Sequence, residues 1–138
     1  MRIELTDDID ACRALRRAVF IDEQGIAEAD EWDDRDDQAI HLLAWQDGAP
    51  VGTARILLLG STGKIGRVCV LPEARGTGLG SVLIRAAMDV LRSRSGITHA
   101  RLGAQVGAMG FYRKLGFEAQ GPVYDDAGIP HQDMIRAL

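Results

Sequence analysis

The stretch "VLPEARGTGLGSVLIRAAM", residues 70–88, constrains the fold more than any other part of the chain. An apolar run typical of a strand leads into a loop with three glycines at alternate positions, and an apolar helical stripe follows. A plain turn needs one or two glycines, so three indicate that the backbone itself binds something. The first N–H groups of a helix have no partner within it, and the helix dipole is positive at that end. The order strand, glycine loop, helix therefore predicts a site for a phosphate.

Two common nucleotide-binding motifs do not fit this loop. The Rossmann fingerprint is G-x-G-x-x-G, whereas the three glycines here simply alternate. The Walker A motif is G-x-x-x-x-G-K-[ST], but in the nearby "GSTGK" the residue after Lys64 is Ile65, and the first glycine is missing. The pattern that remains is R-x-x-G-x-G, formed by Arg75, Gly78 and Gly80.

Length and charge narrow the class of protein. A chain of 138 residues with 46% hydrophobic residues suits one domain spanning 1–138. The net charge of −4, without a basic tract, argues against a nucleic-acid partner. No apolar run approaches the roughly 20 residues of a membrane span, and "MRIELTDDID" lacks a signal peptide, so we expect no membrane partner and a cytoplasmic location. Cys12 and Cys69 are predicted to be buried thiols rather than a disulfide or a zinc site.

The rest of the pattern predicts an α+β fold. Strands are expected near the N-terminus (2–5), on both sides of an Asp47–Gly48 turn within 41–59, over 65–71 and 99–105, and after a turn at 126–130. Helices are expected over 8–20, 82–91 and within 107–117. The acidic segment 28–37 reads as a solvated loop or short helix and lacks the pattern of a calcium-binding loop. Strands that come first and helices later favour a mixed, mostly antiparallel sheet flanked by helices.

The loop with Arg75, Gly78 and Gly80 resembles the pyrophosphate loop of the GNAT superfamily of acetyl-coenzyme A-dependent N-acetyltransferases. Downstream, "AQVGAMGFYRKLGF" is similar to the family signature A-x-x-F-Y-x-x-x-G-F, although Gln105 stands where the family often has asparagine. The segments "LRRAVFIDEQGI", "HLLA", "VGTARIL" and "AGIPHQDM" extend the resemblance to the ElaA/YjcF branch over nearly the whole chain. The resemblance implies the GNAT acyl-CoA N-acyltransferase fold.

The resemblance also implies acetyl-CoA as co-substrate and a place for it. In the GNAT fold a β-bulge separates the strand at 65–71 from the strand that ends at Gln105, and the pantetheine lies in that gap. The residues expected to contact acetyl-CoA are Val68, Cys69, Val70, Arg75, Gly76, Thr77, Gly78, Leu79, Gly80, Ser81, Gln105, Ala108, Phe111 and Tyr112.

The implied activity is transfer of an acetyl group to a primary amine of a small molecule by direct attack through a tetrahedral intermediate. Tyr112 matches the family position that protonates the departing thiolate, and a phenol suits that task. Glu23 is the first candidate for the general base, with His41, His131 or water as alternatives. An acetyl-thiol intermediate on Cys69 is a minor alternative.

The acceptor site is expected between the "FIDEQGI" turn, the strand carrying Arg67 and the C-terminal "GIPH". Glu23, Arg67 and His131 would surround it, and the arginine would hold an acid group of an amino-acid-like acceptor. Arg55 could share that face with Arg67, or both arginines could pair with acidic residues instead.

Two other functions compete with acetyl transfer. Arg16, Phe20, Asp33, Asp36 and Arg55 also resemble the pattern of acyl-homoserine-lactone synthases, which need a longer C-terminal half than this chain has. A CoA-binding sensor or interaction module without turnover would use the same loop. The acceptor, the acyl-chain preference, the general base and the oligomeric state, with a homodimer as one option, are not determined by these patterns. No metal site is expected.

Overall fold

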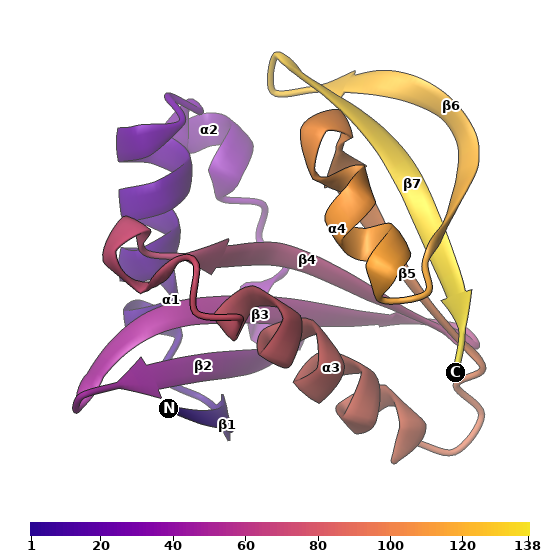
Figure 1. Ribbon diagram of the computed structural model, residues 1–138, viewed down its shortest axis with the longest axis horizontal. Coiled ribbons are helices and arrows are strands. Elements are labelled where there is room, and N and C mark those ends of the chain that lie inside the picture. The colour runs from indigo at the N-terminus through magenta and orange to yellow at the C-terminus, as the bar shows by residue number, and fades with distance from the viewer.

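The computed structural model describes all residues, 1–138, and contains a seven-stranded sheet in the order β1-β2-β3-β4-β5-β7-β6 (Figure 1). Only β4 and β5 run parallel, and every other neighbouring pair is antiparallel. The predicted mixed, mostly antiparallel sheet is therefore confirmed. The strands are β1 (Arg2–Thr6), β2 (Ile40–Gln46), β3 (Ala49–Leu59), β4 (Thr62–Val70), β5 (His99–Gln105), β6 (Glu118–Asp126) and β7 (Ile129–Ala137).

The helices are α1 (Ile9–Arg16), α2 (Glu28–Glu31), α3 (Leu79–Arg92) and α4 (Met109–Lys114). Three of them, α1, α3 and α4, fall where the apolar spacing predicted them, but their ends differ, and α2 is the short helix that was one of the two alternatives for the acidic segment. A π-helix, Arg17–Glu23, continues α1, so the predicted helix changes its hydrogen-bond pattern halfway. Helix α3 starts at Leu79, three residues before the predicted start, which brings the last glycine of the loop into the helix. None of these helices is long and apolar enough to cross a membrane.

Helices cover both faces of the sheet. Successive strand residues point to opposite faces, so Leu42 and Leu43 of β2 mark one face each. Leu42 belongs to the main core with residues of α3 and α4, whereas Leu43 packs with Cys12 of α1 and Cys69 of β4. Helix α1 thus lies behind the sheet and α3 and α4 lie in front of it (Figure 1). Both cysteines are buried free thiols, as predicted.

The strand β6 is absent from the sequence-based prediction. All nine of its residues are exposed, and it lies at the edge of the sheet beside β7. A strand with both faces in solvent has no alternation of apolar and polar residues, which is the signal that identifies half-buried strands.

The sheet splits in its middle. Along β3 and β4, Thr53 pairs with Cys69 but Arg55 pairs with Gly66, so β4 carries one extra residue, a β-bulge. Within the bulge Arg67 has a φ of +50°, a left-handed conformation that is uncommon and strained for a residue other than glycine. The parallel pairing of β4 and β5 stops at Lys64. Beyond that point the two strands diverge, and the expected gap between them is present.

Candidate active site

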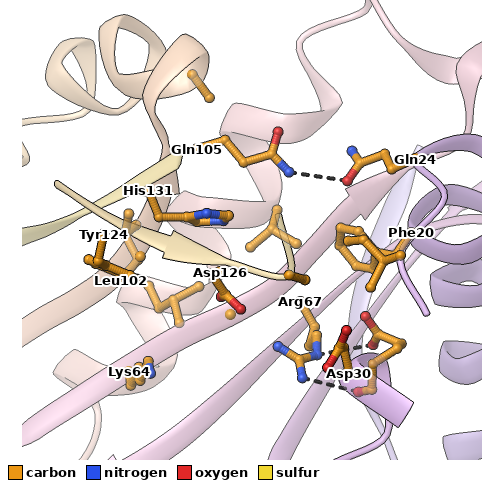
Figure 2. Close-up of a pocket in the computed structure, with 18 of the residues that line it drawn as sticks. Phe20, Gln24, Asp30, Lys64, Arg67, Leu102, Gln105, Tyr124, Asp126 and His131 are labelled. Carbon is orange, nitrogen blue, oxygen red and sulfur yellow. Dashed lines mark hydrogen bonds and ion pairs between the residues drawn. The ribbon is translucent and has the colours of Figure 1, made fainter. Parts of the chain in front are cut away.

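The gap opens into a cavity of about 270 Å³. Its walls come from the bulged half of β4, the end of β5, the turn after the π-helix, helix α4 and the β6–β7 hairpin (Figure 2). These segments are distant in the chain, and the divergence of β4 from β5 is what brings them around one space.

The glycine loop presents free backbone donors beside this gap. Gly78 is the N-terminal cap of α3 with a φ of +81°, and the first backbone hydrogen bond of the helix runs from the Val82 N–H to the Gly78 carbonyl at 3.2 Å. The N–H groups of Leu79, Gly80 and Ser81 have no acceptor within the protein. The Leu79 side chain is buried in the core, so this residue offers only its N–H to a ligand. Three converging donors at a helix N-terminus suit a pyrophosphate.

Arg75 at the start of the loop is already held by other residues. Its Nε donates to the Val70 carbonyl at 3.0 Å, and its two terminal nitrogens donate to both carboxylate oxygens of Glu23 at 2.7 and 2.6 Å. These hydrogen bonds lower the pKa of the exposed Glu23. Glu23 lies against the loop and is not part of the cavity wall. A carboxylate that is paired with Arg75 outside the cavity wall is a poor base for an amine in the cavity.

Gln24, the residue after Glu23, contacts the other side of the gap. The Gln105 amide donates to the Gln24 side-chain oxygen at 3.1 Å, and Figure 2 shows this bond joining the turn after the π-helix to the end of β5. Glu23 and Gln24 therefore contact opposite flanks of the gap. The side chain of Gln105 makes this contact in the free protein.

Tyr112 faces the cavity from α4. Its ring packs edge-on against Phe111 and Phe117, with centroids 5.0 and 6.2 Å away. Burial raises the pKa of Tyr112 to about 12, so the phenol keeps its proton at neutral pH. Phe111 is 39% exposed and lies beside Gly80, where an added Cβ would be 3.5 Å from its ring. The two segments that resemble family motifs thus meet in space.

His131 of β7 also points into the cavity (Figure 2). Its Nδ1 lies 2.7 Å from the Ile129 carbonyl oxygen, which can only accept a hydrogen bond. Nδ1 therefore carries the hydrogen, and in the neutral ring Nε2 has a free lone pair. The ring stacks on Tyr124 with centroids 6.0 Å apart. His41, the other histidine considered as a base, is buried outside the cavity wall with its Nε2 2.8 Å from the Asp36 carbonyl.

Most of the acidic segment 28–37 is exposed, as expected, but two of its carboxylates are buried. Glu31 and Asp36 are each only 3% exposed. A network of four arginines and three carboxylates is formed by Arg13, Arg16, Arg55, Arg67, Glu31, Asp33 and Asp36. Arg16 lies 2.8 Å from both Glu31 and Asp36. A hydrogen bond from Arg55 lowers the pKa of Asp33 to about 2. Burial works to raise the pKa of Asp36, but hydrogen bonds from Arg16 and Arg13 outweigh it and lower the pKa.

Arg67 lines the cavity, yet its charge is engaged in this network. Its Nε lies 3.0 Å from a Glu31 carboxylate oxygen, and a terminal nitrogen lies 3.3 Å from Asp33 and donates to the Glu31 carbonyl at 3.0 Å. Arg55 is buried outside the cavity wall. Sequence reasoning kept surface pairing with acidic residues open as an alternative for both arginines. The structure contains the pairing with acidic residues, but it is buried at Arg55 and partly buried at Arg67.

A sheet split at a bulged strand, beside a glycine loop and an unpaired helix N-terminus, defines an acyl-CoA N-acyltransferase fold. Residues 9–117 match the model of the acetyltransferase (GNAT) family, and the chain belongs to that family. It is 36% identical over 140 residues to Bacillus subtilis YyaT (99% of this chain, 94% of YyaT) and 34% identical over 128 residues to Escherichia coli ElaA (90% of this chain, 84% of ElaA).

Solved structures agree with this assignment. The crystal structure of an acyl-CoA N-acyltransferase from Pseudomonas aeruginosa is 32% identical, with a TM-score of 0.87 over 99% of this chain and all of that one. The crystal structure of E. coli ElaA is 30% identical, with a TM-score of 0.85 over 98% of this chain and 99% of that one. Together with a 31% match to the N-acetyltransferase YjcF of B. subtilis, covering 88% of this chain and 87% of YjcF, these findings confirm the ElaA/YjcF branch.

Proposed function

We propose that the chain transfers an acetyl group from acetyl-CoA to a primary amine of a small molecule, by direct attack through a tetrahedral intermediate. The observation that carries this proposal is the gap between β4 and β5 beside the unpaired N–H groups of α3. In the gap, we expect main-chain groups near Val68, Cys69 and Val70 to bond the pantetheine, because the pairing of β4 with β5 stops at Lys64. The loop from Arg75 to Ser81 would hold the pyrophosphate, with Arg75 remaining beside it.

Bound acetyl-CoA supplies a thioester. Residues of the cavity would accept the proton of the acceptor amine and donate a proton to the departing sulfur. The Nε2 lone pair of His131 is suited to take a proton from the acceptor amine, because Nδ1 is occupied by the Ile129 carbonyl. As the carbon–sulfur bond breaks, the protonated phenol of Tyr112 would donate its proton to the departing sulfur. Both side chains line the same cavity, where the amine nitrogen and the sulfur must lie.

The thiol of Cys69 is not needed as an acyl carrier. Burial raises its pKa to about 12, so it remains a protonated, weak nucleophile. The side chain packs with Leu43 and Cys12 on the α1 side of the sheet. This environment favours direct attack by the amine over a covalent acetyl-enzyme.

Two measurements test the proposal. Millimolar acetyl-CoA and CoA should each raise the melting temperature, and release of the CoA thiol should depend on added primary amine. No thermal shift with either ligand would refute the cofactor assignment. A thermal shift without thiol release across a broad panel of amines would favour the sensor or interaction module instead.

A further inference from the structure

The charges that line the cavity separate into two groups. Glu31 and Arg67 belong to the network of arginines and carboxylates described above, whereas Asp30, Asp126 and Lys64 form no ion pair. Lys64 lies on the part of β4 that is still paired with β5 (Figure 2). Two of these three unpaired charges are therefore negative, and they are the two aspartates.

The network makes Arg67 a poor receptor for an acid group. Arg67 already pairs with two carboxylates, so an acceptor carboxylate at Arg67 would place a third negative charge beside Glu31 and Asp33. Arg67 would also have to give up contacts at 3.0 and 3.3 Å that hold it at the bulge. A like charge placed at such a site is disfavoured.

The remaining surface of the cavity suits a cation. Asp30 comes from α2 and Asp126 from the end of β6, so the two carboxylates approach the space from different walls (Figure 2). Phe20, Tyr112 and Tyr124 add aromatic rings to the lining. Carboxylates attract an ammonium group directly, and the faces of aromatic rings attract it through their quadrupole.

From this arrangement we infer that the acceptor carries a second positive charge in addition to the amine that reacts, as an aliphatic diamine does. Asp30 and Asp126 bind the distant ammonium group while the near amine lies at His131. The volume of about 270 Å³ fits a short chain. The inference rests on the proposed function and names the substrate class of the same site.

A set of four-carbon acceptors of matched length tests the charge preference. The set contains 1,4-diaminobutane, its monoacetylated form, butylamine and 4-aminobutanoate, each assayed by thiol release from acetyl-CoA. The diamine should exceed butylamine about ten- to hundredfold in kcat/KM, the range expected for hydrogen bonds to a charged group. The monoacetylated form should resemble butylamine, and 4-aminobutanoate should be the poorest acceptor.

Variants identify the residues responsible. Asp30→Asn and Asp126→Asn should each raise KM for the diamine about tenfold, while the kinetics with butylamine and the thermal shift with acetyl-CoA stay unchanged. Asp22→Asn is the matched control, because this exposed aspartate lies outside the cavity wall and its loss changes the net charge equally. A comparable rise in KM in Asp22→Asn would mean that a long-range field is responsible and would overturn the inference.

Binding provides a readout that does not depend on turnover. Calorimetric titration of the CoA-bound protein should show the diamine binding more tightly than butylamine, and the two aspartate variants should lose this difference. Equal binding of the two amines, or kcat/KM for 4-aminobutanoate equal to that for the diamine, would overturn the inference. The acetyl-CoA thermal shift reports on the proposed function separately, so the two ideas fail in different ways.

Discussion

Replacement of Gly78 with alanine separates two roles of the glycine loop. The residue has a φ of +81°, and an added Cβ would have no atom within 4 Å. In the free protein the substitution therefore costs only backbone strain. A residue other than glycine pays roughly 1–2 kcal/mol in this left-handed region. Alanine also restricts the unfolded chain, which returns about 0.4–1 kcal/mol, so the net loss should be about 1 kcal/mol.

That loss of stability can be expressed as a decrease in melting temperature. An unfolding entropy of about 2.1 cal/mol/K per residue gives about 0.29 kcal/mol/K for 138 residues, so 1 kcal/mol lowers Tm by about 3 °C. Acetyl-CoA at 100 times its Kd should stabilise the wild type by about 2.7 kcal/mol, or about 9 °C. In Gly78→Ala most of this ligand shift should disappear, because the new methyl group occupies the open side that a phosphate must approach.

Gly60→Ala is the matched control. Gly60 lies in the turn between β3 and β4 with a φ of +63°, and an added Cβ would again have no atom within 4 Å. Differential scanning fluorimetry of both variants, with and without acetyl-CoA, should show similar losses of about 3 °C in the free proteins. Only Gly78→Ala should lose the ligand shift. A full ligand shift in Gly78→Ala would refute the assignment of this loop to the pyrophosphate.

Three further substitutions test other parts of the structure. Tyr112→Phe should leave the acetyl-CoA shift intact and lower turnover about 10²–10⁴-fold when chemistry limits the rate, and unchanged turnover would reduce this residue to a packing role. Gly63→Ala places a Cβ in steric conflict with the Leu91 side chain, so denaturant titration should show a loss of about 1–3 kcal/mol in the free energy of unfolding. A hydrogen bond from Arg55 lowers the pKa of Asp33 from 3.8 to about 2 in the folded state, so its contribution to stability should be complete above about pH 4 and lost as the pH falls toward 2. Asp33→Asn should remove that part of the acid sensitivity, and an unchanged acid-unfolding profile would contradict the pairing.

Several features could be predicted because their signals are local. The Asp47–Gly48 turn and the alternation around it indicated β2 and β3, and both residues have positive φ angles. The stripe after the glycine loop indicated α3, since helical spacing can be read within a few turns. The positive φ of Gly78 follows from its role as the cap of that helix. Such features depend on a residue and its near neighbours.

Other features had weak local signals or none. The change from α-helix to π-helix at Arg17 alters hydrogen-bond partners without altering the apolar spacing enough to be seen. The exposed edge strand β6 has no alternation. The burial of Glu31 could not be read from an acidic segment, because it depends on Arg16, 15 residues away, lying 2.8 Å from it.

The sequence by itself determined the phosphate loop, the strand-then-helix order and the presence of Tyr112 at the matching position, because these are patterns of neighbouring residues. Tertiary structure alone decided which charged side chains are engaged in ion pairs and which are not. Glu23 pairs with Arg75, 52 residues away, and Arg67 is engaged by Glu31, so neither is available in the way its position in the chain suggested. The physical reason is that an ion pair depends on distance in space, and the bulge in β4 and the turn after the π-helix set those distances.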